Sequence, residues 1–327
     1  MAAQPSAAGA GPSREAAELP PLVDSHHHLW DLQQHYPWLQ ENAGKLAVHG
    51  DDAAIRRDYL VADYLADVGD LPLLASVHVD AGAADPIVEA RWLQQLADTA
   101  AASASGHPAQ GLPQAIVAGA KLADPDVSGT LDELVTLPNV RGIRDILNWH
   151  PDPALSYIDR SDLITDPQWL AGFALLEPRG LSFDLQAYPE QLPAAARLAA
   201  DHPSTAIIVN HAGMPVDRSE PAVDQYLAGL AALAAQDNVL MKISGIGMTD
   251  HLWAQAGPGA LAPVVQACID AFTPARCMFG SNFPVDSLYS TYRELYQAFD
   301  ILTVEHSPDE RADMFGRVAA AAYRIRT

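Results

Sequence analysis

Three consecutive histidines follow a short apolar segment near the start of the chain. The segment begins at Val23, and His26 and His28 lie two residues apart within the run that ends at Asp31. Successive side chains of a strand point to opposite faces, so a strand here would place His26 and His28 on the same face. Neutral imidazole is the commonest protein metal ligand, and the pair could hold one divalent ion or a substrate. A histidine-rich surface turn is the alternative.

Polar residues also follow seven later apolar runs. A single polar residue at such a place is often only a cap or a turn, but their repetition indicates a polar catalytic mouth. Arg144 could clamp a carboxylate or form an internal ion pair, and His78 could bind substrate or a neighbouring loop. The residues in question are His78 and Asp80, Lys121, Arg144 and Asp145, Asp184 and Gln186, Asn210 and His211, Lys242 and Ser244, and Ser281, Asn282 and Asp286.

Eight short apolar runs alternate with helical patterns. Nearly continuous apolar runs are typical of parallel strands that are buried on both faces. Eight strand–helix units predict a single, distorted (β/α)₈ TIM barrel, whose active site lies at the carboxyl ends of the strands. An open doubly wound sheet is the alternative, although no glycine-rich phosphate loop is present. After the histidine strand, strands are predicted at 73–80, 115–122, 140–147, 181–186, 205–211, 239–244 and 277–281.

Helices are predicted between these strands and after the last one, where two extra helices close the chain. Two long connections, 31–50 and 148–166, have no periodicity, and the aromatic residues of the first suggest an ordered lid or pocket wall. We expect residues 1–20 to be a disordered lead-in and 21–327 to be the barrel. The predicted helices span 58–68, 85–101, 128–137, 167–176, 193–201, 223–235, 259–272, 291–303 and 308–325.

The composition of the 327-residue chain limits its partners. Its net charge of −22, from 41 acidic and 19 basic residues, argues against nucleic acid and anionic membrane surfaces. Two cysteines, Cys268 and Cys277, form no metal or disulfide pattern and fit a reducing cytoplasm. No run is long enough to span a membrane. We therefore expect a cytoplasmic protein with a small-molecule substrate, and assembly with copies of itself stays open.

Four motifs together resemble a known family. They lie at 24–31 with 36–38, at 141–144, at 210–213 and at 279–286. In this order they are similar to the amidohydrolase superfamily, and most of all to the amidohydrolase 2 group. That group holds fuconolactonase-like sugar-lactone hydrolases and pyrone-dicarboxylate lactonases. The resemblance spans about residues 22 to 320.

The resemblance implies a distorted barrel and hydrolysis of an ester-like bond, often in a lactone, by attack of water. In metal-using members a strand-one histidine pair, here His26 and His28, binds a divalent ion, and His211 corresponds to the strand-six histidine. The strand-eight aspartate of the family, which also takes the proton, is Asn282 here. Asparagine cannot act as a base, so Asp286 or His211 would have to handle the proton. No lysine ends strand four, which argues against a two-metal site. One Zn²⁺ or Mn²⁺ and a metal-independent mechanism both stay open.

Three functions follow from these residues. The first is a hydrolase that opens a small carboxylated or hydroxylated lactone at the C-terminal face of the barrel. The second is a non-hydrolytic lyase, such as a decarboxylase, which would fit the loss of the base at Asn282. The third is a small-molecule binder without catalysis. For the lactonase, the residues expected to bind substrate are Trp30, His78, Arg144, Gln186 and Lys242.

Overall fold

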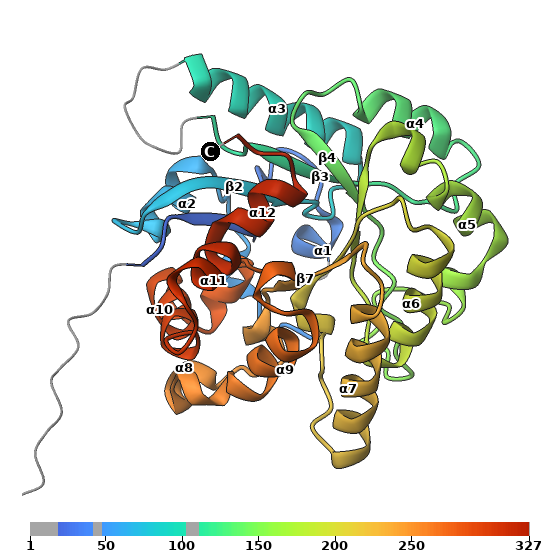
Figure 1. Ribbon diagram of the computed structural model, residues 1–327. Coiled ribbons are helices and arrows are strands. Elements are labelled where there is room, and N and C mark those ends of the chain that lie inside the picture. The colour runs from blue at the N-terminus through green and yellow to red at the C-terminus, as the bar shows by residue number, and fades with distance from the viewer. Residues whose placement is uncertain (1–18, 42–47, 103–110, 327) are drawn as a thin grey trace, which may run out of the picture.

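Eight parallel strands form the centre of the molecule, with helices around them (Figure 1). The computed structural model describes residues 19–41, 48–102 and 111–326. Each strand pairs with the next one along the chain, because the intervening segment returns the chain to the same end of the sheet. The strands are β1 (Leu22–His27), β2 (Leu73–Val79), β3 (Ala115–Gly119), β4 (Val140–Arg144), β5 (Ser182–Leu185), β6 (Ile207–Val209), β7 (Val239–Ile243) and β8 (Cys277–Phe279).

Contacts between the first and last strands close the sheet into a barrel. His28 N donates a 2.7 Å hydrogen bond to the carbonyl of Phe283, and Asn282 N donates one of 2.6 Å to the carbonyl of His26. Both bonds join the end of β1 to the segment that follows β8. The predicted (β/α)₈ barrel is therefore confirmed, and its closing seam lies beside the histidine run.

The helices agree with the predicted segments, with three differences. The predicted loop 31–50 contains the short helix α1, and a further short helix, α8, precedes the predicted helix 259–272. The single closing helix predicted over 308–325 is interrupted by a π-helical turn at Asp313–Arg317. The helices are α1 (Pro37–Gln40), α2 (Val61–Val68), α3 (Pro86–Ala102), α4 (Val127–Leu134), α5 (Pro167–Phe173), α6 (Leu192–Asp201), α7 (Glu220–Ala234), α8 (Trp253–Ala256), α9 (Ala262–Phe272), α10 (Tyr292–Leu302), α11 (Pro308–Ala312) and α12 (Val318–Ala322).

The barrel has a larger apolar core between strands and helices and a smaller one inside. The inner core includes Val77, Val117 and Met278, and α12 packs against it. Figure 1 shows α12 lying across the strands. Tyr323, directly after this helix, is fully buried in the inner core. Residues of α12 and Tyr323 therefore fill one side of the barrel interior, while the carboxyl ends of the strands carry the polar residues.

Three further predictions concern the cysteines, membrane-spanning helices and the N-terminal lead-in. Cys268 and Cys277 are both buried and free, in α9 and β8 respectively, as predicted. No helix in the described part of the chain is both long and apolar enough to cross a lipid bilayer. The predicted disordered lead-in at 1–20 lies almost entirely outside the described residues.

Candidate active site

A cavity of about 410 Å³ opens at the carboxyl ends of the strands. This volume is within the range of pockets that bind small molecules. Apolar side chains from the 148–166 connection, including Pro153, Ala154 and Tyr157, form part of its wall. The polar and charged residues that line it are His28, His49, Asp52, Arg144, Ser156, Gln186, His211 and Asn282.

Three imidazoles gather at one side of this cavity. The ring centroids of His26 and His28 are 5.0 Å apart, and those of His26 and His211 are 4.6 Å apart. All three rings are buried. Burial is the largest cause that lowers the pKa of each of them well below the ordinary value, and neighbouring positive charges such as Arg144 lower it further. At neutral pH all three imidazoles are therefore uncharged, and each has one nitrogen with a free lone pair.

Hydrogen bonds fix which nitrogen of His28 carries its proton. His28 Nδ1 lies 2.7 Å from the carbonyl oxygen of Val79, which can only accept, so Nδ1 is the donor. The lone pair of the neutral ring is then on Nε2. This nitrogen faces Asn282 Oδ1 at 3.3 Å. Two acceptors therefore point at one another in the wall of the cavity.

Asn282 connects this histidine to a buried carboxyl group. Asn282 Nδ2 donates to Asp286 Oδ1 at 2.8 Å, and Gly247 N donates to Asp286 Oδ2 at 3.2 Å. Burial raises the pKa of Asp286 to about 7, although these two bonds lower it. If Asp286 is protonated, it can donate to Asn282 Oδ1 after the amide rotates by half a turn. Asn282 Nδ2 would then donate to His28 Nε2, which removes the conflict between the two acceptors.

The pKa of Asp286 predicts how stability changes with pH. Because it lies above the ordinary value for aspartate, the protonated form contributes stability that is complete below about pH 4 and is lost as the pH rises to about 7. Asp286→Asn resembles the protonated form and should remove this loss, at most about 1.4 kcal/mol per pH unit. Urea unfolding of both proteins between pH 4 and 8 measures it. Parallel pH profiles would contradict the assignment.

A strained turn carries His211 into the cavity. The backbone of His211, Ala212, Gly213 and Met214 is left-handed, with φ values of 55°, 53°, 72° and 48°. For residues other than glycine this costs about 1–2 kcal/mol each. Asn210 and His211 accept backbone bonds of 3.0 and 2.9 Å within the turn. Strain that is maintained in this way is typical of functional sites.

The surroundings of His211 set its orientation. His211 Nδ1 lies 3.1 Å from the hydroxyl of Ser244. The next residue, Gly245, has a φ of 58°, and a Cβ atom there would lie only 2.4 Å from His211 Nδ1. Glycine at this position therefore gives the ring the space that it needs. Nδ1 is engaged with Ser244, so Nε2 is the nitrogen available to a substrate.

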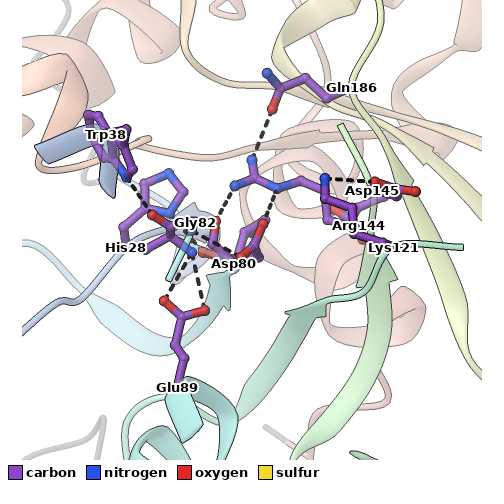
Figure 2. A network of polar contacts seen from close by, with 12 residues as sticks. His28, Trp38, Asp80, Gly82, Glu89, Lys121, Arg144, Asp145 and Gln186 are labelled. Carbon is purple, nitrogen blue, oxygen red and sulfur yellow. Dashed lines mark hydrogen bonds and ion pairs between the residues drawn. The ribbon is translucent and has the colours of Figure 1, made fainter. Parts of the chain in front are cut away.

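Arg144 lies in the cavity wall with its positive charge, and a polar network holds it (Figure 2). Its Nη1 donates to Gln186 Oε1 at 2.9 Å, and its Nη2 donates to the carbonyl of Asp80. Its Nε donates to Asp80 Oδ2 at 3.4 Å. A guanidinium has five N–H bonds, so two remain beyond these three contacts. The charge of Arg144 is balanced by Asp80, but it keeps donors for a substrate oxygen.

Three predicted substrate-binding residues do not lie in the described cavity wall. Trp30 is buried behind His28, and its Nε1 donates to the carbonyl of Arg57 at 2.6 Å. His78 is also buried, with Nε2 3.2 Å from the carbonyl of Leu29. These two residues therefore support the wall from behind.

Lys242 is the third, and it lies inside the barrel. Its side chain is fully buried, and Nζ forms a 2.5 Å ion pair with Asp184. Tyr323 donates to both oxygens of the same carboxylate, at 2.9 and 3.1 Å. An internal ion pair thus takes the place of the predicted substrate-binding role of Lys242, which the sequence could not indicate because the partners are 58 residues apart.

Three polar residues of the wall, His49, Asp52 and Ser156, were not predicted from the sequence. They lie in the long connections that follow β1 and β4, where no periodicity marks which residues face the cavity. The aromatic residues of the first of these connections did predict a pocket wall, and Trp38 lies in it. Tyr36 is fully buried instead.

The imidazole nitrogens of His26 and His28 are of a type that can bind a metal ion. Both ring nitrogens of His26 are buried without a hydrogen-bond partner among the described residues. One of them, together with His28 Nε2, can supply neutral nitrogen donors of the type that Zn²⁺ prefers. In the parts of the chain that the structure describes, however, no group of three or more His, Cys, Asp or Glu side chains is arranged to hold a metal. His26 and His28 are therefore the candidate ligands, in an incomplete set.

Comparisons with known proteins identify the family. The amidohydrolase family profile matches residues 23–325. The chain therefore belongs to the amidohydrolase family. An uncharacterised protein of Sinorhizobium fredii, y4mH, is 39% identical over 93% of this chain and 98% of its own length. L-fucono-1,5-lactonase of Burkholderia multivorans is 28% identical over 93% of this chain and 96% of its own length.

Solved structures share the fold. A crystal structure of an amidohydrolase from Burkholderia multivorans with bound zinc is 26% identical, covers 93% of this chain and 99% of that chain, and has a TM-score of 0.75. A 5-carboxyvanillate decarboxylase from Sphingomonas paucimobilis, 16% identical with a TM-score of 0.57, covers 93% and 99% and shows only that the fold is shared. The resemblance inferred from the motifs is therefore confirmed at the level of the superfamily and its lactonase branch.

Proposed function

We propose that this protein is a hydrolase that opens the ester bond of a small, neutral, hydroxylated lactone. The observation that carries the proposal is that the neutral imidazole of His211 and the donors of Arg144 line the same cavity. A base for water and a donor for a carbonyl oxygen are the two groups that ester hydrolysis needs. The 28% identity to a lactonase supports the choice of a cyclic ester.

The charge of the cavity favours a neutral substrate. Among the described residues that line it, Arg144 is the one cation and Asp52 the one carboxylate. Arg144 is paired with Asp80, and Asp52 accepts two 2.8 Å bonds from Arg56. Lys242 is neutralised by Asp184. A substrate with two carboxylates would therefore find too little positive charge, while hydroxyl groups can pair with the neutral polar groups.

In the proposed reaction, water attacks the ring carbonyl carbon and gives one proton to His211 Nε2. The carbonyl oxygen gains negative charge, which the free N–H groups of Arg144 stabilise. The bond between the carbonyl carbon and the ring oxygen then breaks, and His211 returns the proton to that oxygen. The product is the open hydroxy acid. Asn282 contacts the cavity but only donates and accepts hydrogen bonds, and Asp286 positions its amide from behind.

A divalent metal would add to this arrangement. When held by His26 and His28, it would supply Lewis-acid polarisation of an oxygen in the cavity. The roles proposed for His211 and Arg144 use only side chains of the protein and do not depend on this metal.

Turnover of charged and uncharged lactones tests the substrate class. We expect kcat/KM for D-glucono-1,5-lactone or D-galactono-1,4-lactone to exceed that for 2-pyrone-4,6-dicarboxylate by about 100-fold or more, because each uncompensated buried carboxylate costs several kcal/mol. The assay measures acid release at constant pH, corrected for spontaneous hydrolysis. Faster hydrolysis of the dicarboxylate would contradict the neutral-substrate assignment but not the reaction class.

A lyase on the same fold is the second candidate, and Asn282 is the observation that favours it. With an amide at this position, a carboxylate base is missing from the cavity wall beside His28. A decarboxylation does not require water to be activated. Release of carbon dioxide from an aromatic carboxylate, without lactone hydrolysis, would establish this alternative.

A further inference from the structure

His49 and Asp52 form a polar pair in the cavity wall that the reaction described above does not use. Both line the cavity, and both come from the connection between β1 and α2. His49 Nε2 lies 3.4 Å from Asp52 Oδ2. Their side chains are only 10% and 8% exposed. The pair is therefore enclosed by protein and faces the space that a substrate would occupy.

Asp52 is held rigidly, and this determines the protonation of His49. Arg56 donates to both oxygens of Asp52, with Nε to Oδ1 and Nη2 to Oδ2 each 2.8 Å long. The same guanidinium donates to the carbonyl of Leu39. Because an ionised carboxylate only accepts, His49 Nε2 must donate to it. Burial lowers the pKa of His49 although Asp52 raises it, so the ring is neutral and Nδ1 has a free lone pair.

The backbone around His49 is anchored to the barrel mouth. Tyr289 donates its hydroxyl proton to the carbonyl of His49 at 2.6 Å. His251 Nε2 lies 2.9 Å from the carbonyl of Val48, and its ring stacks on Tyr289 with centroids 4.8 Å apart. Trp38 meets the His49 ring edge to face at 5.6 Å. The backbone of Val48 and His49 is thus held by two hydrogen bonds, and the ring itself is held by Trp38 and Asp52.

His49 adds a hydrogen-bond acceptor at a place in the cavity wall apart from His28 and His211. Arg144 offers hydrogen-bond donors, whereas His49 Nδ1 offers an acceptor and has no partner among the described residues. A hydroxyl group can donate to such a nitrogen, but a carboxylate or a carbonyl cannot. An acceptor held in a fixed place is therefore suited to select for a hydroxyl-bearing substrate.

We propose that His49, positioned by Asp52 and Arg56, determines specificity by accepting a hydrogen bond from a ring hydroxyl of the lactone. This inference rests on the proposed function and deepens it. His49 does not transfer a proton in the reaction. Removing its acceptor should therefore weaken the preference for hydroxylated lactones and leave the hydrolysis of an unsubstituted lactone unchanged.

The test compares two lactones of the same ring size, D-glucono-1,5-lactone and δ-valerolactone, with wild type and His49→Phe. We expect kcat/KM for the hydroxylated lactone to fall by about tenfold or more, because a buried polar partner is left unpaired. The value for δ-valerolactone should change less than about threefold. His49→Asn, which keeps an acceptor close to the place of Nδ1, should restore part of the preference.

Asp52→Asn gives an independent test. The amide has one acceptor oxygen in place of two, so it can no longer accept both hydrogen bonds of Arg56 and that of His49 Nε2, and the orientation of the ring is weakened. The preference should fall as in His49→Phe. His35→Asn is the matched control, because His35 lies in the same connection, is 57% exposed and is not part of the described wall. Thermal unfolding of each variant shows whether the fold is retained.

The outcomes separate the two proposals. If wild type hydrolyses both lactones and His49→Phe lowers kcat/KM equally for both, the proposed role of His49 is overturned. A loss of kcat in His49→Phe with a shifted pH profile would also overturn it, because that result indicates proton transfer by His49. A wild type that hydrolyses only δ-valerolactone would also overturn it. A wild type that hydrolyses neither these nor other lactones would overturn the proposed function itself.

Discussion

His211→Asn should lower kcat for lactone hydrolysis by about 10²–10⁴-fold, the usual contribution of a general base. The imidazole is uncharged at neutral pH, lines the cavity and is oriented through Ser244. Asparagine tolerates the left-handed backbone at this position better than most residues other than glycine, so the strained turn should survive. KM should change much less than kcat, because the proton is transferred only in the transition state.

His306→Asn is a suitable control, because His306 lies between α10 and α11 and is not part of the described cavity wall. It should leave kcat unchanged. If His211→Asn kept more than a tenth of the wild-type kcat, another group would be the base. Asp286→Asn, measured alongside, would then show whether the buried carboxyl is that group.

Asp24→Ala should lower the free energy of unfolding by at least about 3 kcal/mol. Asp24 is fully buried beside the barrel seam and accepts hydrogen bonds from Ser281 N and Oγ at 2.8 and 2.7 Å. The hydroxyls of Tyr64 and Tyr292 also donate to it, at 2.9 and 3.1 Å. Alanine would leave these buried donors unpaired, at about 1–3 kcal/mol for each one that water cannot reach.

Urea unfolding at pH 7 measures this effect. Asp159→Ala, at an exposed position in the 148–166 connection, is the matched control and should change the midpoint little. Asp24→Ala with an unchanged midpoint would mean that the seam is held mainly by the backbone bonds from His28 and Asn282.

The barrel could be predicted because its strands are buried on both faces and therefore appear as short apolar runs. The location of the site could be predicted because the carboxyl ends of all strands in such a barrel lie on one face, where their polar residues come together. His28, Arg144, Gln186, His211 and Asn282 all lie in the cavity wall, as the pattern indicated.

The remaining details depend on contacts between distant segments. Lys242 lies near the end of its strand, where a substrate-binding residue would also lie. Only the folded structure brings Asp184 and Tyr323 close to it, and Lys242 then forms an internal ion pair with Asp184. The burial of Trp30 depends on how its connection folds over the mouth. His49 and Asp52 lie in a connection without periodicity, where the sequence contains no signal for which residues face the substrate.

The reaction class is tested most directly by hydrolysis in water enriched in oxygen-18. The protein is incubated with the hydroxylated lactones, and the product is analysed by mass spectrometry, with evolved carbon dioxide measured in parallel and metal content determined before and after chelation. We predict an open hydroxy acid that carries one oxygen-18 atom in its carboxylate and forms far more slowly with His211→Asn. A product without added water, or release of carbon dioxide, would contradict the hydrolase account. Tight binding of the lactones without turnover would indicate a binding protein on this scaffold.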